Sequence, residues 1–158
     1  MPVMSIDLKL AIKSTSSGNT GQIAGQIGKN LRGKETIVLS SDLGGGKTVF
    51  VKGLAKGAGS NDTVSSPTFT ISKVYKCLEF NIQHFDFYRL NDPGIISLEL
   101  QEVLNDSKNV VVIEWADIVA KVLPNDYFKV EFDQLGQDNR LIKISCPKKL
   151  AYLIEGLR

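Results

Sequence analysis

The feature that most constrains this chain is a glycine-rich loop between two segments of regular structure. The stretch VLSSDLGGGKTVFV, residues 38–51, has three consecutive glycines directly before a Lys-Thr pair. The run from Thr36 to Leu39 is typical of a short strand, and the segment from Thr48 to Ala58 has helical character and ends at GAGSND. This order of strand, glycine loop and helix predicts an α/β fold with a phosphate-binding loop.

Glycines let successive backbone N–H groups turn toward one centre, which forms a concave site for phosphate oxygens at the start of a helix. We expect Lys47 to reach the β- and γ-phosphates of a nucleotide, and the Thr48 hydroxyl to ligate Mg²⁺. The alternative is a glycine-rich turn that binds nothing, but the flanking strand and helix favour nucleotide binding. The residues expected to contact the nucleotide here are Gly44, Gly45, Gly46, Lys47, Thr48 and Val49.

The loop departs from the pattern G-x-x-x-x-G-K-[ST] at its first position, where Ser41 stands in place of glycine. That position mainly supports the bend from strand to loop, whereas Gly44 and Gly46 lie where the backbone must face phosphate. We therefore expect a negative φ at Ser41, and a left-handed conformation there would count against this interpretation.

Two acids stand at the ends of predicted strands. Glu114 follows the apolar run VVVI, and Asp86 follows NIQHF. Either could ligate Mg²⁺ or orient a water molecule, and either could instead be a solvated acid at a strand end. Two such acids downstream of a glycine loop favour a functional role for at least one of them. For His84, the only histidine, we expect a structural role in which it bonds a neighbour's backbone.

The remaining segments predict one α/β domain over residues 1–158 with a mixed β-sheet flanked by helices. The run Asn109 to Trp115 is apolar enough for a strand buried on both faces. Other predicted strands and helices are an opening strand at 6–13, a helix within 16–31, an antiparallel pair at 68–77 and 80–87, a helix after NDPG, and two strands within 126–146 joined by a turn at 136–139.

The charge and composition exclude several classes of protein. A net charge of +2, from 19 basic and 17 acidic residues, provides no overall field for nucleic acid or a membrane surface. The opening residues lack an apolar signal region and no segment is long enough to span a bilayer, so we expect a cytoplasmic protein without membrane contact. Cys77 and Cys146 are far apart, which indicates neither a zinc site nor a disulfide framework.

In order and spacing, the motifs SDLGGGKT, SSPTF, HFDFYRL and VIEWAD resemble the TsaE (YjeE) family, the P-loop ATPases of bacterial threonylcarbamoyladenosine (t6A) tRNA modification. The similarity extends from about Thr20 to Arg140. The G-K-T triplet is common, but S-P-T-[FY], H-x-D-x-Y-R and I-E-W in this order are specific. Besides Ser41, the chain departs from the family at Ala116, where proline often follows Glu-Trp.

The resemblance implies a Mg²⁺-dependent ATPase whose cofactors are ATP and Mg²⁺. It implies that Thr48 and Glu114 hold the metal and that Asp86 is the acid needed for activity, so the catalytic residues are Asp86, Glu114 and Lys47. Thr20 and Arg140 match positions near the nucleotide. The implied partners are the TsaB and TsaD proteins, with tRNA bound indirectly through their complex.

Hydrolysis would then proceed by in-line attack of water on the γ-phosphorus, with Glu114 or Asp86 orienting the water. Two rivals remain open. In one, ATP only orders the SSPTF segment for a partner and hydrolysis is incidental; in the other, the protein is a small-molecule kinase, although no lid rich in arginine is evident.

Overall fold

The structure is a computed structural model that describes residues 6–41, 46–64 and 71–157. It has an α/β fold, which confirms the predicted fold class. In chain order the strands, helices and 3-10 helices (η) are β1 Leu8–Ser14, α1 Ser17–Asn30, β2 Thr36–Ser40, α2 Lys47–Gly57, β3 Ser72–Lys76, β4 Asn81–Asp86, α3 Gly94–Asn105, β5 Asn109–Glu114, η1 Ala116–Val122, β6 Phe128–Gln134, β7 Arg140–Cys146 and η2 Lys148–Ile154.

One mixed sheet of seven strands runs through the molecule in the order β1-β7-β6-β2-β5-β4-β3. β2 lies parallel to both β5 and β6, and β4 lies parallel to β5. The outer pairs β1–β7, β6–β7 and β3–β4 are antiparallel, as predicted for the two hairpins. Because β2, β4, β5 and β6 point the same way, their carboxyl ends meet at one edge of the sheet.

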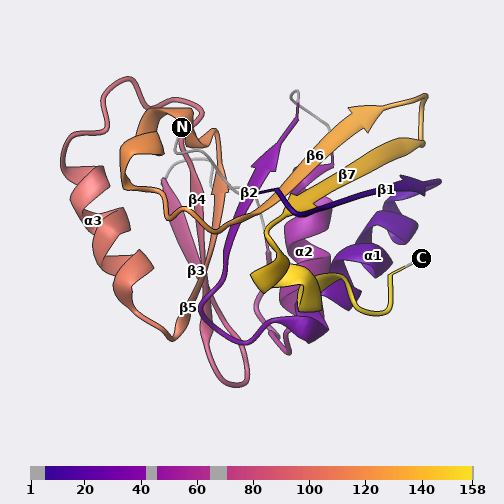
Figure 1. Ribbon diagram of the computed structural model, residues 1–158, viewed down its shortest axis with the longest axis horizontal. Coiled ribbons are helices and arrows are strands. Elements are labelled where there is room, and N and C mark those ends of the chain that lie inside the picture. Colours follow the sequence, from indigo (N-terminus) through magenta and orange to yellow (C-terminus); the bar gives the residue numbers. More distant parts are fainter. Residues whose placement is uncertain (1–5, 42–45, 65–70, 158) are drawn as a thin grey trace.

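Helices cover the two faces of this sheet (Figure 1). α1 and α2 pack on one face, whereas α3 and η1 pack on the other. All six residues of β5 are buried, as expected for a central strand. Val110 and Val112 belong to the core beneath α1 and α2, and Val111 and Ile113 belong to the core beneath α3. Glu114 follows the same alternation and therefore lies on the α1 and α2 face.

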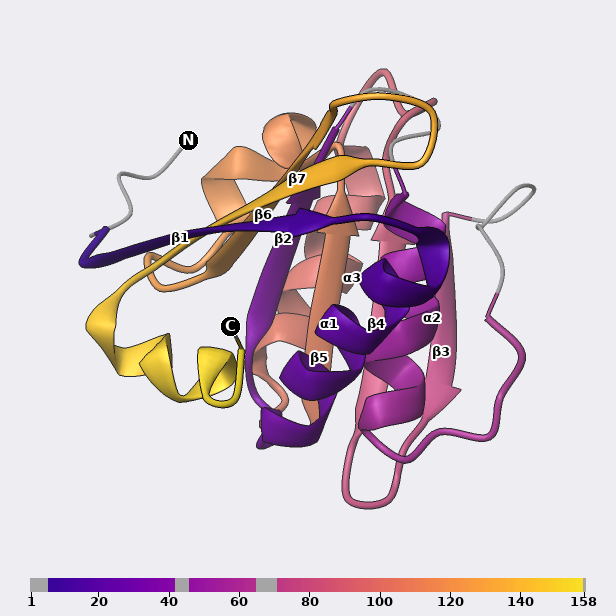
Figure 2. The same ribbon diagram turned by 90° about the vertical axis from the view of Figure 1, so that its right-hand side faces the viewer.

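α1 and α2 pack side by side through glycines (Figure 2). A Cβ atom on Gly28 would lie 2.2 Å from the carbonyl oxygen of Leu54, and one on Gly57 would lie 2.1 Å from that of Gly25. Real side chains do not tolerate such distances, so only glycine allows the two helix backbones to approach this closely. This packing fixes α2, whose first residue is Lys47, against the rest of the fold.

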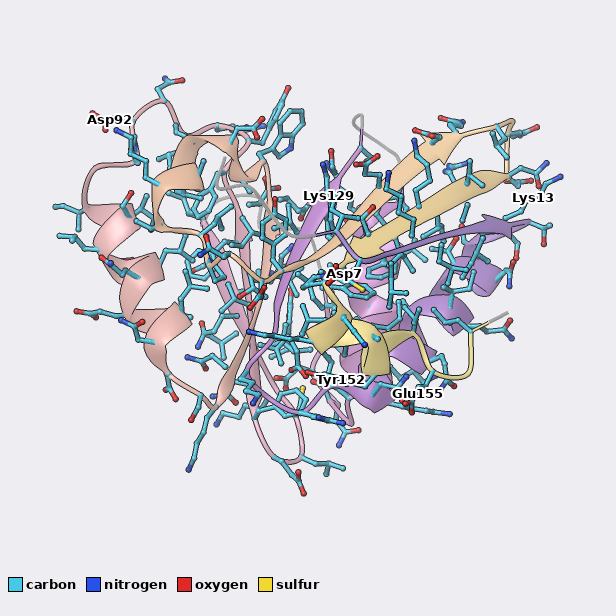
Figure 3. All side chains as sticks on the ribbon, in the orientation of Figure 1. Asp7, Lys13, Asp92, Lys129, Tyr152 and Glu155 are labelled. Atoms are coloured by element: carbon cyan, nitrogen blue, oxygen red, sulfur yellow. The ribbon has the colours of Figure 1, made fainter. Side chains whose placement is uncertain are left out.

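At the opposite end of β2, a buried acid joins the C-terminal segment to the sheet. Glu35 is 2% exposed and accepts hydrogen bonds from the backbone N–H groups of Arg32 and Gly33. Its carboxylate also accepts a 2.5 Å bond from the hydroxyl of Tyr152 in η2. Figure 3 shows Tyr152 at the end of the molecule away from the carboxyl end of β2. The contact ties η2 to the start of β2.

Within residues 6–41, 46–64 and 71–157, no helix is long and apolar enough to cross a membrane. The loop residues 42–45 and the SSPTFT segment, 65–70, lie outside the described residues.

Candidate functional site

The candidate site lies where the carboxyl ends of β2, β4 and β5 meet the start of α2. Gly46 is the residue just before α2 and adopts a left-handed conformation with φ 99°. This conformation suits glycine and leaves open space where a Cβ atom would stand. Gly44 and Gly45 lie outside the described residues, so their predicted phosphate contacts stay predictions.

Lys47 begins α2 and is 7% exposed, which is unusual for a lysine. Its Nζ atom lies 3.4 Å from the carbonyl oxygen of Ser41, to which it donates, and 3.6 Å from Oε1 of Glu114. The ammonium group also lies 4.9 Å from the centroid of the Trp115 ring. The lysine is thus held inside the site by a carbonyl, a carboxylate and an aromatic face.

Glu114 ends β5 and is buried, with its two carboxylate oxygens in different environments. Oε1 faces Lys47, and Oε2 lies 2.6 Å from Nε2 of His84. Our expectation that His84 bonds a neighbour's backbone is therefore wrong. His84 pairs with Val112 in the parallel register of β4 and β5, so it shares a sheet face with Glu114 two residues further on.

Asp86 stands directly beside Glu114, because the two are register partners at the ends of β4 and β5. Its Oδ1 atom accepts a 3.0 Å hydrogen bond from the N–H of Tyr88. Burial raises the pKa of Asp86 above its ordinary value, and the charge of Glu114 raises it further. A carboxylate with a raised pKa is a better proton acceptor than an ordinary one.

Trp115 has a strained backbone. Among the described residues it is the one non-glycine residue with positive φ, at φ 58° and ψ 51°. This turn directs its ring over Lys47 and beside Tyr88, with the Tyr88 and Trp115 ring centroids 4.9 Å apart. Ser41 is not in this left-handed group, in agreement with the negative φ predicted for it.

A pocket adjoins these residues and is lined in part by Ser40, Ser41, Lys47 and Trp115. Asp117 and Lys129 also line it. Figure 3 shows Lys129 beside β2, in agreement with its pairing opposite Val38. The pocket therefore combines two lysines with one acid, and the two lysines suit an anionic ligand.

Thr20 and Arg140 lie at this same edge but on its far side, around the end of β1. Thr20 is buried and its hydroxyl lies 2.6 Å from that of Ser14, which pairs in register with Arg140. The Arg140 Nη1 atom donates to backbone carbonyls of the β6–β7 turn. The structure places both residues next to Ser14, and their predicted contact with nucleotide stays a prediction.

The donor set suits Mg²⁺. Thr48 and Val49 lie in the first turn of α2, with Thr48 exposed and Val49 half-buried. In the part of the chain that the structure describes, no group of three or more His, Cys, Asp and Glu side chains is arranged for a metal ion. Mg²⁺ in phosphate sites commonly takes only one or two protein oxygens, with water and phosphate oxygens as its other ligands. A hydroxyl from Thr48 and the Oε1 atom of Glu114 match this chemistry.

The sequence analysis missed three contributors to the site: the contact of His84 with Glu114, the ring of Trp115 over Lys47, and Lys129. The H-x-D spacing placed His84 and Asp86 on one strand face. Only the pairing of β4 with β5 shows that this face also carries Glu114. The register of β6 against β2 similarly places Lys129 beside the loop strand.

Comparison with known proteins agrees with this geometry. Residues 14–142 match the family described as threonylcarbamoyl adenosine biosynthesis protein TsaE. A protein of Rickettsia typhi named tRNA threonylcarbamoyladenosine biosynthesis protein TsaE is 35% identical over 144 residues, which cover 90% of this chain and 96% of the relative. A protein of the same name from Bacillus subtilis is 37% identical over 112 residues, which cover 71% of this chain and 70% of the relative.

A crystal structure of Bacillus subtilis YdiB has a similar fold, with a TM-score of 0.76 and 26% sequence identity. The match covers 96% of this chain and 94% of YdiB. Together with the glycine before α2 and the acids at the strand ends, these similarities show that the chain belongs to the TsaE family of threonylcarbamoyladenosine biosynthesis proteins.

Proposed function

We propose that this protein binds ATP with Mg²⁺ at the edge formed by β2, β5 and α2, and that it hydrolyses ATP in support of t6A modification of tRNA in the cytoplasm. The observation that carries the proposal is the placement of Lys47 beside Glu114 at the start of a helix that follows a glycine loop. Membership of the TsaE family supports the role in tRNA modification.

In the proposed reaction, Lys47 turns from Glu114 to the β- and γ-phosphates, where its charge stabilises the negative charge of the transition state. Thr48 and Glu114 supply oxygen ligands for Mg²⁺, which neutralises phosphate charge when it is bound. Water forms a new bond to the γ-phosphorus as the bond to the β,γ-bridging oxygen breaks, which releases ADP and phosphate. Asp86, with its raised pKa, is suited to orient that water and accept its proton.

We further propose that the protein works with the TsaB and TsaD proteins of the same modification system, and meets tRNA only through their complex. The half-exposed ring of Trp115 lies beside that of Tyr88 and next to the Lys47 ammonium group, so a docked protein can contact the site itself. This placement fits a hydrolysis rate that depends on partners.

The test is phosphate release from Mg-ATP by the purified protein, measured with and without TsaB and TsaD. The proposal predicts turnover that the partners stimulate, that Lys47→Ala abolishes, and that the exposed-lysine control Lys52→Ala in the same helix retains. Glu114→Gln is expected to bind ATP but to lose turnover. ATP binding without turnover under any condition would instead support a nucleotide-gated binding module, and a phosphorylated acceptor molecule would indicate a kinase.

A further inference from the structure

We propose that His84 is a positioning residue for Glu114. Its Nε2–H group holds one carboxylate oxygen in place, so that the other oxygen faces the nucleotide loop. This inference rests on the proposed function, because it assigns a purpose to the orientation of Glu114.

The contact is short and buried. His84 is 0% exposed, and its Nε2 atom lies 2.6 Å from Oε2 of Glu114. The two side chains come from the neighbouring strands β4 and β5, which pair over six residues. A hydrogen bond in this setting has little freedom to rearrange, because the imidazole is fixed by packing on every side.

The ring nitrogens assign the direction of the bond. An ionised carboxylate can only accept, so Nε2 must carry the proton that it donates. The other nitrogen, Nδ1, is buried and has no hydrogen-bond partner among the described residues. A proton on Nδ1 would be a buried donor without an acceptor, which is more costly than a bare acceptor nitrogen. The geometry therefore assigns the proton between the two side chains to Nε2.

This bond separates the roles of the two carboxylate oxygens. Oε2 is occupied by His84, whereas Oε1 points to Lys47 at 3.6 Å. When Lys47 moves to phosphate, Oε1 is the oxygen left free to bind a metal ion. Hydrogen bonds from outside the coordination shell commonly orient metal-binding carboxylates in this way, and their loss weakens metal binding or activity about 10- to 100-fold.

The first test uses the unmodified chain. His84 is the only histidine, so untagged protein labelled with ¹⁵N-histidine has a single imidazole signal in a ¹H–¹⁵N spectrum. We expect a proton on Nε2, with an Nε2 shift that changes more on adding Mg²⁺ with ADP than on adding ADP with EDTA. A proton on Nδ1 and a bare Nε2 would overturn the proposal without any variant having to fold.

The second test compares two replacements of similar length that differ in one donor. His84→Gln keeps an N–H group at the end of the side chain, and His84→Met does not. Mn²⁺ binding to the ADP complex, measured by electron paramagnetic resonance, is expected to weaken about 10-fold or more in His84→Met and to stay within about 3-fold of wild type in His84→Gln. ADP affinity in EDTA is expected to be equal in all three proteins.

The outcomes of these tests distinguish the positioning role of His84 from the proposed ATPase function. Equal Mn²⁺ binding by wild type and His84→Met would overturn the positioning role and leave the ATPase proposal standing. Equal losses in the Gln and Met variants would also overturn it, because the ring would then act only through packing. A wild-type protein that bound neither ADP nor its metal complex would contradict the proposed function itself.

Discussion

Lys47 Nζ lies 3.6 Å from Glu114 Oε1, so the cation expected to bind phosphate rests against the acid expected to bind metal. Both groups are buried, and each partly compensates the charge of the other. Nucleotide and metal would therefore have to replace this internal ion pair, with phosphate taking Lys47 and Mg²⁺ taking Glu114. The ion pair thus holds the two side chains in the positions from which their expected ligands would displace it.

This relationship predicts energetic coupling between the two residues in the unliganded protein. Replacing Lys47 alone by Met leaves Glu114 buried without its cation, whereas the double variant Lys47→Met with Glu114→Gln removes both charges. We expect a double-mutant cycle by urea unfolding to give a coupling of about 1–3 kcal/mol. The exposed pair Lys149 and Asp126 is the control and is expected to couple far more weakly. Additive effects of the Lys47 and Glu114 changes would contradict the ion pair.

The ionised carboxylate of Asp86 is expected to lower the free energy of unfolding. Because its pKa is raised in the folded protein, the native state holds the proton more tightly than the unfolded state does. The stability this group contributes is thus fully present below the ordinary pKa of about 3.9 and is lost as pH rises through the higher folded value.

Asp86→Asn removes this titration and keeps an oxygen to accept the N–H of Tyr88. We expect its Tm at pH 7 to exceed that of wild type by about 1–3 °C, with a difference that shrinks toward pH 4. Phosphate release should fall in the same variant. A Tm difference between Asp86→Asn and wild type that is smaller at pH 7 than at pH 4 would contradict this prediction.

The contact between Tyr152 and Glu35 is expected to stabilise the fold without affecting the site. Tyr152→Phe deletes the hydroxyl that donates to a buried carboxylate, at a cost of about 1.5–3 kcal/mol in the free energy of unfolding. Burial raises the pKa of Tyr152, and the Glu35 carboxylate raises it further. The stability that the Tyr152 hydroxyl contributes therefore persists up to about pH 10 and is lost above it.

Urea unfolding between pH 7 and 11 measures both effects. The difference between wild type and Tyr152→Phe should narrow above pH 10, and nucleotide affinity should not change. Tyr88→Phe alters a half-exposed ring and serves as the control for loss of a tyrosine hydroxyl. Equal stabilities of wild type and Tyr152→Phe at pH 7 would remove this contact from the account.

The close approach of α1 and α2 predicts opposite effects for two glycines in one helix. Gly28→Ala places a Cβ atom 2.2 Å from the Leu54 carbonyl oxygen, and the overpacking is expected to cost about 1–3 kcal/mol. Gly21→Ala meets nothing within 4 Å and gains helix propensity, with an expected stabilisation of up to about 1 kcal/mol. Similar unfolding midpoints for the two variants would show that the helices separate easily.

The sequence predicted those parts of the fold whose signal is local. The all-apolar run before Glu114 indicated a buried strand, and β5 occupies Asn109–Glu114. The glycines before Lys47 indicated a helix start, and α2 begins at that residue. In both cases the local pattern and the tertiary environment favour the same structure.

The order of the strands could not be predicted from the sequence, because it depends on contacts between residues far apart along the chain. His84 and Glu114 are 30 positions apart, and their bond exists only because β4 and β5 are parallel neighbours. The left-handed backbone conformation of Trp115 could not be predicted either, since no local sequence signal indicates it.

The central claim is that Lys47 and its loop bind the phosphates of ATP. Its most direct test is calorimetric titration of ATP, with Mg²⁺ and with EDTA, into wild type, Lys47→Ala and the exposed-lysine control Lys52→Ala. We predict that Lys47→Ala weakens ATP binding at least about 10-fold, which corresponds to about 1.4 kcal/mol, while Lys52→Ala binds like wild type. Equal affinities in all three folded proteins would contradict the assignment of this loop as the nucleotide site.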